Sequence, residues 1–238
     1  MDNSANLVKT CLVTRIAHDG REQIEDIILQ EDRWELFCDG KSISTHNCLP
    51  LGLKQMAVGQ LRYKGLIQSA AEIADIDVNE ARKKIEIRLK TDTAQGQVLK
   101  EEALAKFSAG DIHRLQNDFE VRCGLFRRTG CAHNCALADT NGILFYFEDV
   151  ARHNAMDKLL GEFLLQNMDA GGKVLFFSGR LALDILEKSI ATGVKVLVSP
   201  GAPTLAAVEA AKAHDLTILG FVRPNNINIY ANPQRISD

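Results

Sequence analysis

The sequence predicts an α/β protein in which a layered domain with parallel strands and crossover helices follows a smaller N-terminal α+β region. The main observation is that short apolar runs at 173–177, 194–198 and 216–222 alternate with helical stripes through the C-terminal part. Such alternation with short loops is typical of parallel strands joined by crossover helices. A polar stretch without periodicity at 90–101 separates this part from the first. We therefore expect an N-terminal region at 1–105 and a C-terminal domain at 106–238.

Composition limits the function. The chain has 238 residues, of which 46% are apolar and 25% charged, with a net charge of −3. These values indicate an ordered globular protein and exclude a nucleic-acid binder that acts through net positive charge. There is no apolar run of about 18 residues that would insert into a membrane, and residues 1–20 have no signal-peptide stretch. We expect a cytoplasmic protein.

The N-terminal region begins with a predicted hairpin. Residues 34–38 alternate apolar and polar side chains up to Asp39 and Gly40, a strong turn signal, and 41–45 form the return strand. An apolar stripe at helical spacing follows Pro50 and ends near Gly65. Residues 84–89 alternate again and predict a strand.

A long helix is predicted from Asp111, which would be its N-cap, to Gly130. Its apolar stripe continues through Cys123 to Phe126. A hairpin turning at Asn141 and Gly142 follows. Asp149 is then the expected N-cap of a helix whose core face is Met156, Leu159, Leu160, Phe163 and Leu164. The two helices between the last three strands are expected at 181–190 and 205–211.

Two loops follow predicted parallel strands and are suited to binding an anion. They contain Ser178, Gly179 and Arg180, and Ser199, Gly201 and Thr204. Each supplies a hydroxyl group and a glycine before a helix N-terminus, where unpaired N–H groups attract anions, although ordinary turns favour the same residues. Arg152, His153 and Asn154 crowd the first turn of another predicted helix. Asp149, Asp157 and Lys158 nearby also fit a helix cap and solvated surface charges.

The six cysteines are expected to be reduced thiols, because disulfides are rare in chains without a secretory signal. Cys11, Cys38 and Cys48 fit small buried residues, and Cys123 lies on an apolar helix stripe. Cys131 and Cys135 flank His133, which could stabilise a nucleophilic thiolate. The same three residues also fit a zinc site or a buried core.

Five motifs in order resemble the FdhD/NarQ family of formate dehydrogenase accessory sulfurtransferases. They lie at 127–133, 148–158, 178–180, 202–204 and 220–224, and 34–67 also resembles the family's N-terminal region. The resemblance implies a three-layer fold similar to the cytidine deaminases and a homodimer. It also implies that sulfur passes from a cysteine desulfurase, as a persulfide, to the bis-molybdopterin guanine dinucleotide cofactor of formate dehydrogenase. A guanine nucleotide would mimic part of that cofactor.

The resemblance also implies where the cofactor binds. The matching positions, together with the anion-suited loops, are Thr129, Gly130, Asp149, Arg152, His153, Asn154, Ser178, Gly179, Arg180, Ser199, Gly201, Thr204, Phe221, Val222, Arg223, Pro224, Asn225 and Asn226.

One feature departs from the family pattern. The family carries a CxxC pair in a loop before the helix that ends at Thr129 and Gly130, whereas 90–105 contain no cysteine here. Either Cys131, Cys135 or Cys123 carries sulfur, with Cys131 favoured and His133 assisting, or the chain is a non-catalytic chaperone for the cofactor. A zinc deaminase is a weaker alternative, because His-x-Glu and Pro-Cys-x-x-Cys are absent.

Overall fold

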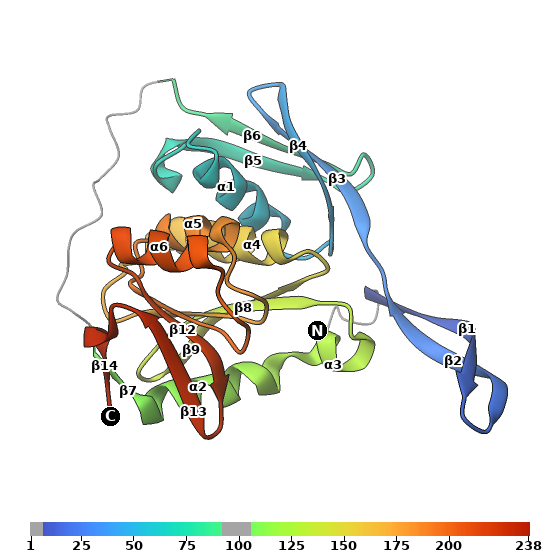
Figure 1. The fold of residues 1–238 in the computed structure, drawn as a ribbon. Coiled ribbons are helices and arrows are strands. Elements are labelled where there is room, and N and C mark those ends of the chain that lie inside the picture. The colour runs from blue at the N-terminus through green and yellow to red at the C-terminus, as the bar shows by residue number, and fades with distance from the viewer. Residues whose placement is uncertain (1–6, 92–105) are drawn as a thin grey trace.

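The computed structural model describes residues 7–91 and 106–238. The expected linker at 90–101, apart from its first two residues, and the expected boundary at 105 lie outside the described residues. The described chain forms two main sheets, one of four strands and one of six, with helices between them and on the far side of the larger sheet (Figure 1). No helix in the described ranges is long and apolar enough to cross a membrane.

The four-stranded sheet confirms the predicted N-terminal hairpin and strand. Its order is β4-β3-β6-β5, with bounds Lys41–Cys48, Asp32–Cys38, Lys84–Leu89 and Ile73–Asn79. Asp39 and Gly40 both have positive φ values, 47° and 75°, as a two-residue turn of this kind requires. Helix α1 (Leu53–Tyr63) packs its buried stripe against this sheet, and the chain turns at Gly65 as expected.

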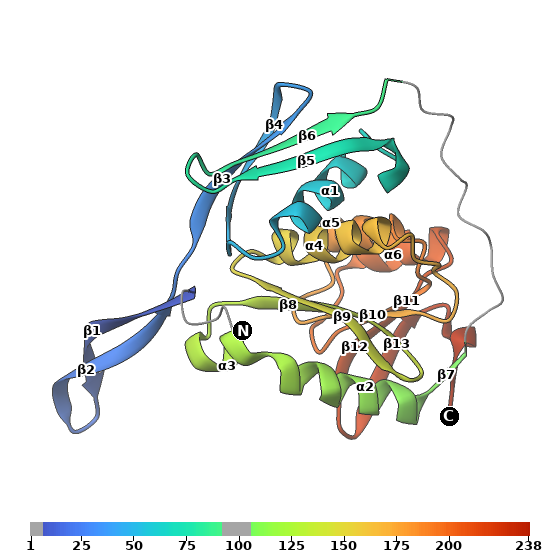
Figure 2. The ribbon, with the colours of Figure 1, turned by 180° about the vertical axis from the view of Figure 1, so that it is seen from behind.

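A separate two-stranded ribbon projects from the body, as both ribbon views show (Figures 1 and 2). It consists of β1 (Val8–Ala17) and β2 (Gly20–Leu29), which pair only with each other among the described strands. Leu12 and Ile16 are 69% and 71% exposed on it. Cys11 is exposed there as well, so the expectation that it is buried is wrong, whereas Cys38 and Cys48 are buried as predicted.

The predicted helix from Asp111 is two helices. Helix α2 (Ala109–Arg122) begins at Ser108, whose hydroxyl accepts a hydrogen bond from the Asp111 N–H, and Asp111 reciprocates as the third residue of a capping box. The N-cap prediction was therefore three residues late. The backbone departs from helical geometry at Cys123, and α3 (Gly124–Thr129) turns Phe126 outward, leaving it 48% exposed.

The six-stranded sheet carries the parallel strands that were predicted. Its order is β13-β12-β11-β10-β8-β9, with bounds Asn226–Ala231, Thr217–Arg223, Val196–Val198, Val174–Phe177, His133–Asp139 and Gly142–Asp149. Strands β10, β11 and β12 are parallel, whereas β8, β9 and β13 are antiparallel to their neighbours, so the sheet is mixed. The hairpin of β8 and β9 turns at Asn141 and Gly142 as expected. A short parallel pair joins β7 (Phe107–Ser108) to β14 (Ile236–Ser237).

Helices cover both faces of this sheet, which gives the expected three layers. Helix α2 packs on one face, and α4 (Arg152–Leu165), α5 (Leu183–Ile190) and α6 (Leu205–Ala213) pack on the other (Figure 2). Helix α1 lies against α4 and brings the four-stranded sheet over this second layer. The likeness to cytidine deaminases stays an expectation.

Helix α4 is buried on two sides because α1 covers the side that would otherwise face water. Lys158 is 1% exposed and Asp157 is also 1% exposed, so neither is the solvated charge that its sequence pattern allowed. The helix begins one residue after its N-cap, Ala151, and Asp149 is instead the last residue of β9. The capping role expected for Asp149 is therefore wrong.

Candidate functional site

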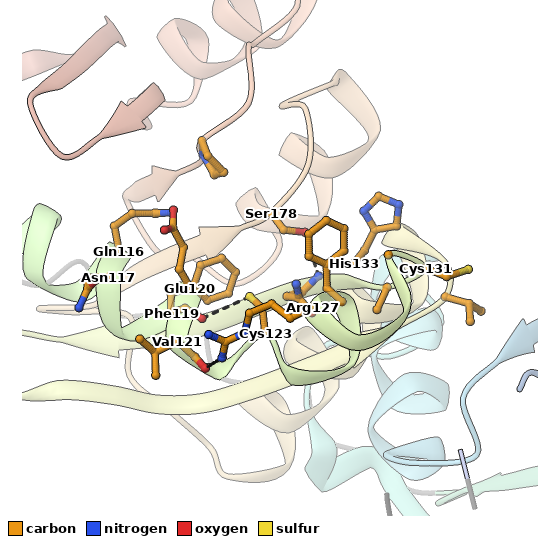
Figure 3. Close-up of a pocket in the computed structure, with 16 residues that line it drawn as sticks. Gln116, Asn117, Phe119, Glu120, Val121, Cys123, Arg127, Cys131, His133 and Ser178 are labelled. Atoms are coloured by element: carbon orange, nitrogen blue, oxygen red, sulfur yellow. Dashed lines mark hydrogen bonds between the residues drawn. The ribbon is translucent and has the colours of Figure 1, made fainter. Parts of the chain in front are cut away.

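A pocket of about 760 Å³ could hold a ligand. Helices α2 and α3 form one side of it (Figure 3). The other side contains His133 at the start of β8, Ser178 after β10 and Pro200 after β11. Apolar walls and a few polar groups in a cavity of this size are typical of a small-molecule site. Cys131 and His133 lie together at one end and Gln116 at the other.

The two loops suited to an anion lie side by side at the carboxyl ends of β10 and β11, as predicted. Leu181 forms an isolated parallel bridge with Pro203, and the Ser199 hydroxyl donates to the Gly179 carbonyl at 2.5 Å. Gly201 lies so close to Gly179 that an added Cβ would be 2.7 Å from its carbonyl oxygen. The two loops are therefore in direct contact with each other.

This contact corrects one ligand assignment, that of Ser199. Ser199 is fully buried, and its oxygen accepts from the Gly201 N–H, so its hydroxyl holds the loops together. Thr204 caps α6 by accepting from the Ala207 N–H. The loop of Ser178, Gly179 and Arg180 was expected to lead directly into a helix. Helix α5 instead begins at Leu183, so this expectation is wrong. Ser178 lines the pocket although its hydroxyl accepts from the Asn134 N–H, and the exposed Arg180 forms no salt bridge within the described chain.

The first turn of α4 presents two of the three polar residues predicted there. Arg152 and His153 both contact Asp184 of α5 at 3.2 Å, and both reach the surface. Burial, and then the nearby Arg152 charge, lower the pKa of His153. Asn154 is only 4% exposed and bonds to Asn47, Asp149 and His46, so it supports the scaffold instead of facing a ligand.

Asp149 is the centre of that scaffold. Its carboxylate accepts hydrogen bonds from the Leu49 and Ala151 N–H groups, from Asn154 and from Lys158 at 2.5 Å. It is completely buried, and direct contact with a ligand is therefore excluded. Buried charges need pairing of this kind because desolvation is costly. The interaction ties the end of β4 to the start of α4.

The thiols differ sharply in accessibility. Cys131 is exposed in the pocket wall, as predicted, and follows Gly130, whose φ of 66° ends α3. Cys135 is fully buried in the core and donates to the Ala155 carbonyl at 2.8 Å, and burial raises its pKa well above the usual thiol range. Burial also raises the pKa of Cys123, which donates to the Phe119 carbonyl and is buried as predicted. Cys135 is removed from the catalytic candidates.

His133 lies near Cys131 with a lowered pKa. Burial is the first cause, and the Arg152 charge adds to it. The imidazole is therefore neutral at neutral pH, so it can accept a proton from a thiol but does not stabilise a thiolate as a cation. The trio does not form a zinc site, because Cys135 points into the core. Within the described ranges no group of three or more His, Cys, Asp or Glu side chains could hold a metal ion.

The stretch 221–226 lies at the carboxyl end of β12 beside the two loops. Phe221 is 42% exposed and has a φ of 50°, a strained conformation for a bulky residue, while its N–H donates to the Gly201 carbonyl. Arg223 is exposed, whereas Val222 is fully buried and belongs to the core. Pro224 and Asn225 turn the chain into β13, which begins at Asn226.

Two pocket residues were missed by sequence reasoning. Gln116 is 5% exposed and Asn134 is 1% exposed, and both line the pocket. The available signal for Gln116 was its place beside Leu115 and Phe119 on the buried stripe of α2, where a polar side chain is unusual. Asn134 had no such signal, because its partner Ser178 is far away in the sequence and pairs with it only in the fold.

Comparisons with known proteins agree in pointing to one family. The model of the FdhD/NarQ family matches residues 29–106 and 91–237. A sulfur carrier protein FdhD from Shouchella clausii (strain KSM-K16) is 33% identical, and the alignment covers 90% of this chain and 91% of that relative. The sulfur carrier protein FdhD of Bacillus subtilis (strain 168) is 28% identical, with 91% and 92% covered.

A solved structure is similar over nearly the whole chain. The crystal structure of a formate dehydrogenase accessory protein from Desulfotalea psychrophila matches with a TM-score of 0.87 and 26% sequence identity. The match covers 97% of this chain and 100% of that one.

Proposed function

Because this chain belongs to the FdhD/NarQ family, we propose that it is a formate dehydrogenase accessory protein that carries sulfur to a molybdenum cofactor. The observation that supports this most is the exposed thiol of Cys131 in the wall of a large pocket at the carboxyl edge of the sheet. A sulfur carrier needs an accessible thiol beside a space that can hold the acceptor.

The transfer begins at the Cys131 thiol. The neutral His133 accepts its proton, and the thiolate attacks the outer sulfur of a persulfide on a cysteine desulfurase. The S–S bond of the donor breaks, its cysteine leaves as a thiolate, and a new S–S bond forms on Cys131. No external oxidant or reductant is needed for this exchange. The acceptor of the sulfur is the bis-molybdopterin guanine dinucleotide of formate dehydrogenase. The protein acts as a homodimer.

Incubation with a cysteine desulfurase and cysteine tests the carrier. We expect mass spectrometry to show one added sulfur on Cys131, lost completely in Cys131→Ala. Cys11→Ala is the matched control, because Cys11 is the other exposed thiol, and Cys123→Ala should also keep the adduct. An adduct that persists in Cys131→Ala, or none on any cysteine, would contradict the carrier role.

A non-catalytic cofactor chaperone is the second candidate function. It is favoured by the lack of cysteine at 90–105, where the family carries its CxxC pair. Under this alternative the cofactor still binds, and no sulfur adduct forms. Restoration of formate dehydrogenase activity by Cys131→Ala, in a strain without its own accessory protein, would favour the chaperone.

The nucleotide end of the cofactor is expected at the loop edge. Arg180 has no salt-bridge partner among the described residues and can bond to a phosphate, with Ser178 beside it. We expect calorimetry to show that GDP binds more tightly than guanosine. Arg180→Ala should lower the affinity for GDP by about tenfold or more, because it removes one hydrogen bond to a charged group. Arg82→Ala, which changes an exposed arginine in the turn between β5 and β6, is the control. Equal affinities for GDP and guanosine would contradict a phosphate site here.

A further inference from the structure

The β1–β2 ribbon is exposed over most of its length. Its base is fixed to the body, where Leu29 packs in a cluster with Leu125 of α3. Beyond the base the ribbon projects outward (Figures 1 and 2), and Leu12 and Ile16 are 69% and 71% exposed on it. A two-stranded hairpin without further strands is marginally stable in water. A partner that covers these apolar side chains would therefore stabilise the ribbon.

The strand register shows which side chains accompany Leu12 and Ile16 on one side of the ribbon. Directly opposite residues of an antiparallel pair point to the same side, and every second pair repeats that side. The three successive pairs on this side, which we call the ribbon face, are Leu12 with Glu25, Thr14 with Gln23, and Ile16 with Arg21. In the middle pair the Gln23 amide donates to the Thr14 hydroxyl at 2.9 Å. The ribbon face thus has two exposed apolar residues on β1 and one charge of each sign on β2.

This pattern is complementary to itself. Consider two ribbon faces in contact, related by a two-fold axis that passes between their middle pairs, perpendicular to the strands. Each β1 then lies antiparallel against the other β1, and each β2 against the other β2. Leu12 meets the partner's Ile16, and Arg21 meets the partner's Glu25, and the symmetry makes each contact twice. An isologous interface requires this kind of self-complementarity, which a partner of different sequence would not.

We propose that two copies of this chain associate through their ribbon faces. The inference rests on the homodimer of the proposed function and assigns the surface that forms it. The ribbon is about 34 Å long and two strands wide. One face of that size offers less than the ~800 Å² per partner of a stable interface. The dimer is therefore expected to dissociate on dilution.

Charge reversal tests the contact between the two β2 strands. Arg21→Glu makes acidic groups face each other across the axis, and Glu25→Arg makes basic groups do so. Each variant alone should dimerise at least about tenfold more weakly than the wild type, measured by analytical ultracentrifugation of the full-length protein. An equimolar mixture of the two variants restores both ion pairs, so we expect it to form a heterodimer, which also shows that both variants are folded. A mixture that dimerises no better than the separate variants would overturn the proposal.

A matched pair of exposed apolar residues tests the contact between the two β1 strands. Ile16→Ser should weaken dimerisation by at least about tenfold, because it removes two apolar contacts from the dimer. Leu205→Ser is the control, since Leu205 is 74% exposed at the start of α6 and lies outside the ribbon. It should dimerise as the wild type does. Equal dissociation constants for the two serine variants would contradict a ribbon-to-ribbon contact.

The remaining outcomes separate this inference from the proposed function and from other occupants of the ribbon face. A wild-type protein that stays monomeric well above micromolar concentration overturns both the homodimer and this inference. If Ile16→Ser then weakens binding to a cysteine desulfurase, the ribbon face binds the sulfur donor instead. A dimer that persists in every ribbon variant overturns only this inference. A wild-type protein that dimerises as expected but takes no sulfur on Cys131 loses its carrier role and keeps the ribbon contact.

Discussion

Asp149→Ala is expected to lower the free energy of unfolding by about 3–5 kcal/mol, measured by urea denaturation followed by circular dichroism. The substitution leaves the Lys158 ammonium buried with only the Leu49 and Glu148 carbonyls, at 3.4 Å and 3.3 Å. It also removes the acceptor of the Leu49 and Ala151 N–H groups. An unpaired buried charge is among the most destabilising changes a chain can undergo.

Two controls test whether the loss of stability comes from leaving a buried charge unpaired. Asp75→Ala breaks the exposed ion pair with Arg88 and should cost no more than about 1 kcal/mol. The double variant Asp149→Asn with Lys158→Met should lose less stability than Asp149→Ala, because neither buried charge remains. If Asp149→Ala changes stability by less than the surface control, the buried pair does not hold the start of α4.

The elements that sequence reasoning identified correctly are those set by local patterns. The turn at Asp39 and Gly40 requires positive φ values, and β6 at Lys84–Leu89 alternates strictly, so both were predictable. The parallel strands and the adjacency of their two loops followed from the order of elements. These features depend on near neighbours and on simple rules of chain connection.

The errors come from tertiary contacts. Helix α4 has one apolar stripe in its sequence, and nothing local shows that α1 covers its opposite side and buries Lys158. The same applies to Cys135 and Cys131, which are four residues apart in one polar motif. Cys135 lies within β8, which is buried on both faces, whereas Cys131 precedes the strand and is exposed in the pocket wall. Burial of polar residues was the least predictable property of the site.

Gly161→Ala is expected to destabilise the protein by at least about 3 kcal/mol or prevent folding, because α1 and α4 touch backbone to backbone. A Cβ at Gly161 would lie 1.8 Å from the Gln55 carbonyl oxygen of α1. Alanine favours helix over glycine by about 1 kcal/mol, which is too little to offset that clash.

Gly124→Ala is the matched control for that substitution. Gly124 is the first residue of α3, and a Cβ there would meet no atom within 4 Å. Its thermal midpoint should stay the same or rise slightly, whereas that of Gly161→Ala should fall by many degrees in the same scan. The close helix contact also holds the four-stranded sheet over the layer that contains Arg152 and His153. GDP binding should therefore fall in any folded fraction of Gly161→Ala and stay unchanged in Gly124→Ala. Equal thermal midpoints for the two variants would contradict a packed α1–α4 contact.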